Sequence, residues 1–89
     1  MASKRQEYYN AKDIFIKATG GANIGPQEII KYVFSKSFKY AVCVSKAITP
    51  KNSVFFSVAV VDAEKMQLEK NLCKSFDELE DANKYINSI

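Results

Sequence analysis

Val54-Phe55-Phe56-Ser57-Val58-Ala59-Val60-Val61 is the stretch of sequence that decides the fold. Its residues are almost all β-branched, aromatic or small, the types that strands favour. A run of eight residues is too short for a long core helix, and its composition is that of a strand buried on both faces. We therefore predict a central strand at residues 54–61.

Alternating apolar residues predict one further strand on each side of this run. The first begins at Phe38, and one of its faces carries Phe38, Tyr40, Val42 and Val44. The other strand is amphipathic and carries Met66, Leu68 and Leu72 on one face. Turn-forming residues at 49–53 and 62–65 make both connections short. Short connections predict a three-stranded antiparallel meander.

The first part of the chain predicts a helix from Lys4 to Thr19, because apolar residues recur there at three- and four-residue spacing. Ser3 and Gln6 have the pattern of a capping box, and Gly20-Gly21 offers a left-handed end. The alternative is a strand over residues 13–19, where β-branched residues favour extended backbone. The sequence also leaves open whether residues 1–10 form a helix or a mobile arm.

A second helix is predicted from Pro26 to Ser37. Proline is favoured at the first helical position, and Glu28 would lie near the positive end of the helix dipole. The spacing of the apolar residues gives this helix a stripe of Ile29, Ile30, Val33 and Phe34. The preceding connection holds all three glycines of the chain, so it is expected to need unusual backbone angles.

A closing helix is predicted after Ser75-Phe76-Asp77-Glu78, which has the pattern of a second capping box. It would cover the sheet face that carries Phe38, Tyr40, Val42 and Val44, since an open sheet with one apolar face needs a cover. We therefore predict one α+β domain over residues 1–89. Two helices precede a three-stranded antiparallel meander, and a C-terminal helix packs on it, in the order ααβββα.

Length and composition fit an ordinary soluble domain, with 89 residues, 47% of them hydrophobic and 26% charged. No apolar run is long enough to span a membrane, and the charged first residues lack a secretory leader, so we expect a cytoplasmic protein without a membrane partner. Cys43 and Cys73 are then expected as reduced thiols, although a disulfide in an oxidising compartment stays open.

The chain contains no histidine, which argues against the common catalytic triads and most transition-metal sites. The carboxylates fall on predicted solvent-exposed positions, where little would shift their pKa values. We therefore expect no catalytic residue, no metal site, no cofactor and no enzymatic activity.

Charge is the one organised surface feature. Residues 1–52 hold nine Lys and Arg against three Asp and Glu, whereas residues 53–89 hold four against seven. The basic half could form a surface for an acidic partner or for phosphates, with tyrosines adding stacking to single-stranded nucleic acid. The candidate partner-binding residues are Lys4, Arg5, Tyr8, Tyr9, Lys36, Lys39, Lys46 and Lys51.

Two functions follow from these patterns. The first is that of a small non-enzymatic protein that binds another protein, as an inhibitor, adaptor or regulator, or that binds itself as a homo-oligomer. Exposed aromatic residues and an exposed edge of the first or third strand would serve as docking sites. Such proteins are often encoded by viruses or mobile elements, although no residue here shows such an origin. The second is nucleic-acid binding through the basic N-terminal half.

Overall fold

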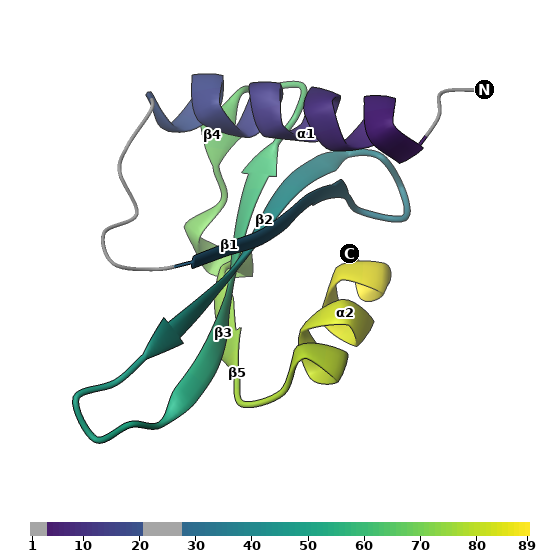
Figure 1. Cartoon of the computed structure of the whole chain (residues 1–89). Helices are drawn as coiled ribbons and strands as arrows, with labels where there is room; N and C mark the ends of the chain where they lie inside the picture. Colours follow the sequence, from purple (N-terminus) through teal and green to yellow (C-terminus); the bar gives the residue numbers. More distant parts are fainter. Residues whose placement is uncertain (1–3, 21–27) are drawn as a thin grey trace.

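The computed structural model of this chain describes residues 4–20 and 28–89, with side chains described from Tyr9 onward. The elements are α1 (Lys4–Thr19), β1 (Glu28–Phe34), β2 (Tyr40–Ile48), β3 (Val54–Asp62), β4 (Gln67–Leu68), the 3-10 helix η1 (Lys70–Leu72), β5 (Lys74–Phe76) and α2 (Leu79–Ser88). They form three layers, with α1 on one face of the sheet and α2 on the other (Figure 1). The mixed helix and antiparallel sheet class is confirmed.

The sheet has the order β1-β2-β3-β4, and β5 pairs with β3 further along the same edge as β4. All neighbours are antiparallel, and β2 pairs with β3 along its full length, from Tyr40↔Asp62 to Ile48↔Val54. The predicted central strand is confirmed as β3. Its second half is buried on both faces, because Val58 and Val60 lie under α2 while Val61 lies under α1.

The first helix has the predicted bounds, and the alternative strand at 13–19 is wrong. Ala11 and Phe15 are buried against the sheet, where the ring of Phe15 lies 5.8 Å from that of Tyr32. The four-residue spacing places both side chains on the face of α1 that lies against the sheet. Gly20 follows with φ at 70°, the left-handed end that the glycine pair predicted. Ser3, the predicted cap, lies outside the described residues.

The closing helix covers the predicted face of the sheet. Ala82 and Ile86 of α2 are buried against Val42, Val44 and the neighbouring valines of β3. The predicted capping box at Ser75 is wrong, because Ser75 lies within β5, opposite Ser57, and α2 begins only at Leu79. Pairing with β3 keeps this segment extended.

The predicted second helix is wrong, and with it the order ααβββα, because in the described part of the chain only one helix precedes the strands. Residues 28–34 form β1, which pairs antiparallel with β2. The register shifts between Ile29 and Lys31, which marks a β-bulge. The bulge changes which face each following residue occupies, so apolar residues of a strand acquire a spacing that imitates a helix. Pro26 lies outside the described residues.

Within residues 4–20 and 28–89 the sheet also has five strands, where three were predicted. The predicted third strand, residues 66–72, contains only the two residues of β4 and then the turn η1. The predicted first strand begins at Tyr40 and not at Phe38, since Phe38 lies in the β1–β2 turn with φ at 59°. The hairpin turn between β2 and β3 falls at the predicted residues 49–53.

Candidate partner-binding site

One edge of the sheet is formed by β1. Among the described residues only β2 pairs with it, so its other side has no neighbouring strand. An unpaired edge presents main-chain donors and acceptors to which another chain can bind. The sequence predicted an exposed edge on the first or the third strand. The predicted first strand is β2, which lies inside the sheet, whereas β4, within the predicted third strand, lies at the edge opposite β1.

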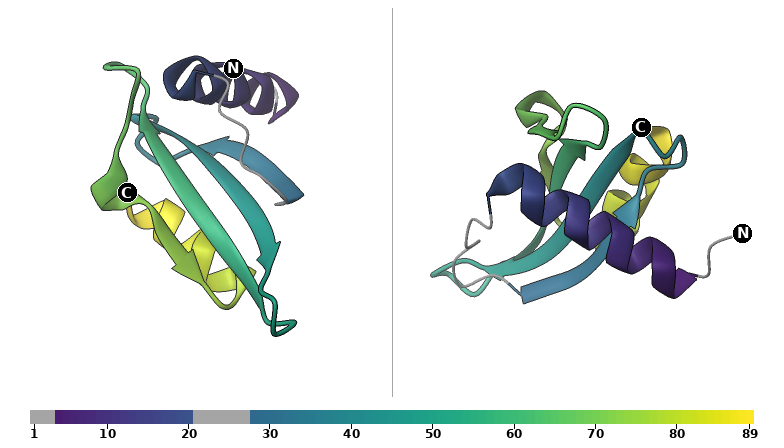
Figure 2. Two further views of the ribbon diagram at one scale, coloured as in Figure 1. Left: turned by 90° about the vertical axis from the view of Figure 1, so that its left-hand side faces the viewer. Right: turned by 90° about the horizontal axis from the view of Figure 1, so that it is seen from above.

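A groove of about 600 Å³ runs between β1 and α2. It exists because α2 contacts β3 and β5 on the far side of the sheet and leaves the β1 side of this face less covered (Figure 2). The apolar part of the groove is made by Val33 and Ile86, and Phe34 and Phe38 contribute near the β1–β2 turn. A volume of this size lies within the range of roughly 300–1,000 Å³ that is usual for binding pockets.

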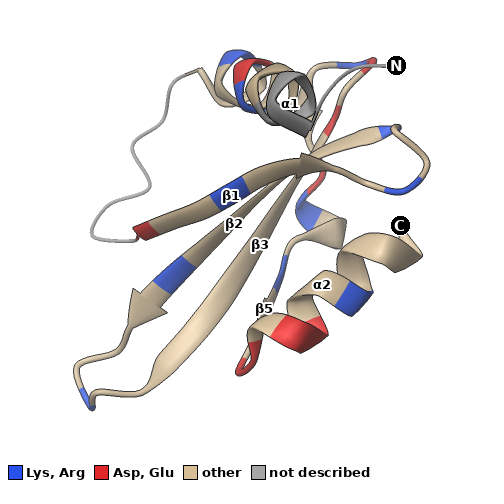
Figure 3. Cartoon of the chain, turned by 45° about the vertical axis from the view of Figure 1, so that its right-hand side comes forward, with Lys and Arg blue, Asp and Glu red and all other residues tan. Residues whose placement is uncertain are grey.

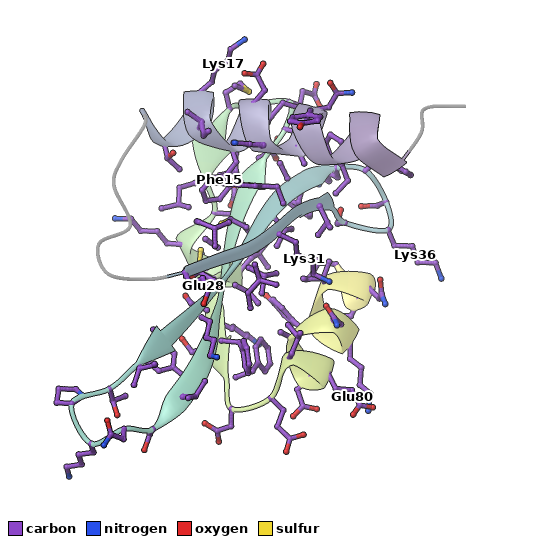
Figure 4. All side chains as sticks on the ribbon, viewed as in Figure 1. Phe15, Lys17, Glu28, Lys31, Lys36 and Glu80 are labelled. Carbon is purple, nitrogen blue, oxygen red and sulfur yellow. The ribbon has the colours of Figure 1, made fainter. Side chains whose placement is uncertain are left out.

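The polar part of the groove comes from two lysines and two asparagines. Lys31 and Lys36 line it from β1 and the following turn, and Asn83 and Asn87 line it from α2. Lys31 points from β1 toward α2 (Figure 4), where its Nζ donates a hydrogen bond of 2.6 Å to Oδ1 of Asn83. None of the described lining residues is acidic. The groove is therefore a positively charged site with an apolar floor.

Phe38 stands at the end of this groove and is unusual in two ways. Its side chain is 61% exposed, and its backbone has a φ of 59°. Left-handed backbone costs a bulky residue about 1–2 kcal/mol. Exposing the aromatic ring to water gives no burial energy that would offset this cost. The turn from Ser35 to Phe38 is closed by a 2.9 Å hydrogen bond, and the Phe38 ring lies 5.7 Å from that of Phe34. The turn thus holds an aromatic side chain in solvent at an energetic cost.

The described lysines of the predicted site fall into two groups. Lys36 and Lys39 are exposed in the β1–β2 turn, while Lys46 and Lys51 lie toward the β2–β3 hairpin, at the other end of β2 (Figure 3). Lys39 has an internal role, because its Nζ lies 5.5 Å from the centre of the Tyr40 ring. Lys36 forms no ion pair with any described residue, so its charge is available to a ligand.

The other predicted residues lie on α1. Tyr9 is 52% exposed and lies beside Asp13 and Ile16 on the outer side of the helix. Lys4, Arg5 and Tyr8 belong to the same helix, but their side chains lie outside the described residues. The N-terminal end of α1 lies toward the same end of the molecule as the β1–β2 turn (Figure 1). That these residues bind a partner stays a prediction.

The two cysteines differ in setting, and neither is in a disulfide. Cys43 is buried on the α1 face of the sheet, where burial raises the pKa of its thiol to about 11 although a hydrogen bond with Tyr32 acts in the opposite direction. Cys73 is half-buried, and its Sγ donates to the carbonyl of Glu69 and accepts from the N–H of Val60. Both thiols therefore serve the packing of the sheet and of η1.

Among the side chains that the structure describes, in residues 9–20 and 28–89, no three metal-ligating groups come close enough together to hold an ion. Neither described helix has the length and apolar composition that crossing a bilayer requires.

The groove itself was missed from the sequence, because Ile29, Ile30, Val33 and Phe34 were assigned to a helix. A signal was available: five of the seven residues of Glu28–Phe34 are β-branched or aromatic, the types that favour strands. Asn83 and Asn87 carried no such signal, since their role depends on the placement of α2 over β3.

Comparison with known proteins gives no match: no protein-family model, no curated protein and no solved structure matches this chain. The site is therefore interpreted from its own residues.

Proposed function

We propose that this chain is a small non-enzymatic protein that works by binding another protein, as an inhibitor, adaptor or regulator. The observation that carries the proposal is the free side of β1 next to the groove between β1 and α2. Strand edges of this kind bind extended segments of partners through the main chain, and a neighbouring groove selects their side chains. A cytoplasmic location, expected from the sequence, stays part of this proposal.

Phe38 supports the same function. Exposed aromatic residues commonly anchor protein interfaces, where they are buried when the partner binds. A backbone held in a costly conformation at an exposed position is typical of binding sites, because the strain is tolerated only where the side chain is needed. Two other exposed apolar residues, Ile29 and Ile30, lie on β1 and extend this surface along the edge.

Site-specific photo-crosslinking tests the proposal. The photoreactive amino acid p-benzoylphenylalanine replaces Phe38 in one variant and Lys51 in a control, since Lys51 is exposed at the distant β2–β3 hairpin. In cells of the natural host, the probe at position 38 is expected to form a covalent adduct with a protein, and the probe at position 51 is not. The proposal fails if position 38 gives no protein adduct, or if both positions give the same ones.

Nucleic-acid binding is the second candidate, favoured by one observation. Lys36, Phe38 and Lys39 share the β1–β2 turn, which combines positive charge with an exposed ring for stacking. Its support is weaker, because Lys46 near the end of β2 and Lys51 in the following turn lie away from the β1–β2 turn and do not extend this patch. If this function holds, a labelled single-stranded oligonucleotide binds with an affinity that falls steeply as salt rises. An affinity independent of salt removes it.

A further inference from the structure

We infer that the groove between β1 and α2 binds an extended, acidic segment of the partner protein, whose main chain pairs with the outer edge of β1. The inference rests on the proposed function and names the chemistry of the partner. Four features of the described residues carry it: the direction of main-chain groups on β1, the amides of α2, the apolar floor and the sign of the charge.

The first feature is the direction of the main-chain groups. Ser35 N–H donates to the carbonyl of Tyr40 at 2.9 Å, which continues the β1–β2 ladder by one pair. Hydrogen-bonded and non-hydrogen-bonded pairs alternate along an antiparallel ladder. The next pair, Phe34↔Ala41, is therefore non-hydrogen-bonded, and the N–H and C=O of Phe34 are directed away from β2. No described residue bonds to these two groups, so they are available to an added strand at the end of the groove near Phe38.

The second feature is a pair of carboxamides on the opposite wall. Asn83 and Asn87 are four residues apart on α2, which places them on one face of the helix, and both line the groove. A carboxamide offers both donors and an acceptor, the same groups that a peptide main chain presents. A segment lying in the groove thus meets hydrogen-bonding groups from β1 on one side and from α2 on the other.

The third feature is the apolar floor. Val33 points to the α2 side of the sheet, where it packs with the cluster that contains Ile86. In a strand added beside β1, alternate side chains point to the same side. Small or β-branched side chains at those positions would lie over Val33 and Ile86, so the segment is expected to alternate apolar and polar residues.

The fourth feature is charge, which decides between occupants. Lys31 and Lys36 line the groove and no described lining residue opposes them, so an acidic segment is complementary. A second copy of this chain would not be complementary in charge, because its own β1 and following turn would bring the same two lysines to the groove. Like charges brought together across strands destabilise pairing. We therefore assign the groove to a different protein.

Selection from a phage library of random linear peptides tests the inference. Sequences recovered on the wild-type protein are expected to be rich in Asp and Glu and to alternate these with β-branched residues. A synthetic peptide of the selected sequence is then expected to bind Lys36→Glu about tenfold or more weakly. Lys51→Glu, which makes the same charge change at the β2–β3 hairpin, is expected to bind as the wild type does.

Further variants separate the components of the site. Methylating alternate main-chain nitrogens of the peptide removes the donors that strand pairing needs, and binding is expected to be lost. Asn87→Glu is expected to weaken binding, while Asn87→Gln largely retains it. The inference is overturned if the library yields basic peptides or no peptide. It is also overturned if the peptide binds Lys36→Glu and Lys51→Glu equally, or if main-chain methylation leaves binding unchanged.

These outcomes are distinct from failure of the proposed function. If position 38 cross-links to a protein while no acidic peptide is recovered, the chain binds proteins but by another surface chemistry. Dimerisation in sedimentation equilibrium that Lys36→Glu strengthens and Lys51→Glu leaves unchanged would assign the groove to a second copy and overturn the inference. If an unrelated oligonucleotide displaces the peptide as potently as unlabelled peptide does, the groove is assigned to nucleic acid and the inference is overturned.

Discussion

Lys31 of β1 and Asn83 of α2 are joined by a 2.6 Å hydrogen bond from Nζ to Oδ1, across 52 positions of sequence. This contact connects the edge strand to the helix on the opposite wall of the groove. It holds the lysine charge inside the groove and fixes the position of one of the two carboxamides. The walls of the candidate site are therefore coupled before any partner binds.

A double-mutant cycle measures this coupling. Lys31→Met keeps the apolar stem and removes the donor, and Asn83→Ala removes the acceptor. Each is expected to lower the free energy of unfolding in urea by about 0.5–1.5 kcal/mol, and the double mutant by less than the sum of the two. The exposed pair Lys84 and Glu80, 3.8 Å apart, provides the control cycle and should couple weakly. Additive effects of Lys31→Met and Asn83→Ala would show that the contact does not join the two walls.

Phe38 offers a test of function against stability. Phe38→Gly relieves left-handed strain worth about 1–2 kcal/mol, but glycine gains freedom in the unfolded chain and the contact with Phe34 is lost. These effects oppose one another, so the free energy of unfolding is expected to change by less than about 1 kcal/mol. Adduct formation with the partner should nevertheless disappear when the probe is placed at position 30 of this variant, and should persist with the same probe in the chain that keeps Phe38. A much larger loss of stability would make Phe38 a structural residue.

Asp62 gives the fold a predictable response to acid. Its Oδ1 accepts hydrogen bonds from the N–H groups of Lys65, at 2.8 Å, and Glu64, at 2.9 Å, and these bonds hold the pKa of the carboxyl below its usual value. A lowered pKa in the folded state adds stability above the unfolded pKa of about 3.9, and this stability is lost as the pH falls through the folded value.

Asp62→Asn is the matching variant, because it keeps an acceptor at the same position without the titration. Its deficit in unfolding free energy relative to the wild type is expected to be constant near neutral pH and to shrink as the pH falls below about 4. Urea unfolding across this pH range measures it. A deficit that stays the same down to the lowest pH would show that the Asp62 charge plays no part.

The thiols should react at different rates. Cys43 is 1% exposed and has a pKa of about 11, so little thiolate exists at neutral pH and reagents reach it poorly. Iodoacetamide is therefore expected to label Cys73 first in the folded protein, and Cys43 only after unfolding in urea. Mass spectrometry of the labelled peptides reports both rates. Equal labelling of the two thiols in the folded protein would contradict the buried position of Cys43.

The interior of the sheet could be predicted from the sequence, because its signals were local and strong. The run at residues 54–61 is almost wholly strand-forming, and Ala11 and Phe15 recur at helical spacing before Gly20. Each of these segments buries the face that its own period indicates, so tertiary packing and local pattern agree. The packing of the last helix on Val42 and Val44 could be predicted for the same reason.

The edge of the sheet could not be predicted in the same way. The bulge between Ile29 and Lys31 interrupts the alternation of β1, and Pro26 added a misleading helix-start signal. Ser75 likewise had a capping pattern, but pairing of β5 with β3 keeps it extended. Both wrong predictions hid the groove, because it forms only when residues 28–34 are the edge strand and α2 lies toward β5. Among the predicted binding residues whose side chains are described, only Lys36 lines it.

Amide hydrogen exchange of β1, followed residue by residue with NMR, tests the central claim most directly. If β1 is an edge strand, the amide of Val33, directed toward β2, exchanges slowly, whereas that of Phe34, directed outward, exchanges fast. Binding of the selected acidic peptide should then slow the exchange of Phe34 selectively. Slow exchange at every consecutive amide from residue 30 to 37 in the free protein would indicate a helix or a covered edge, and would contradict the account.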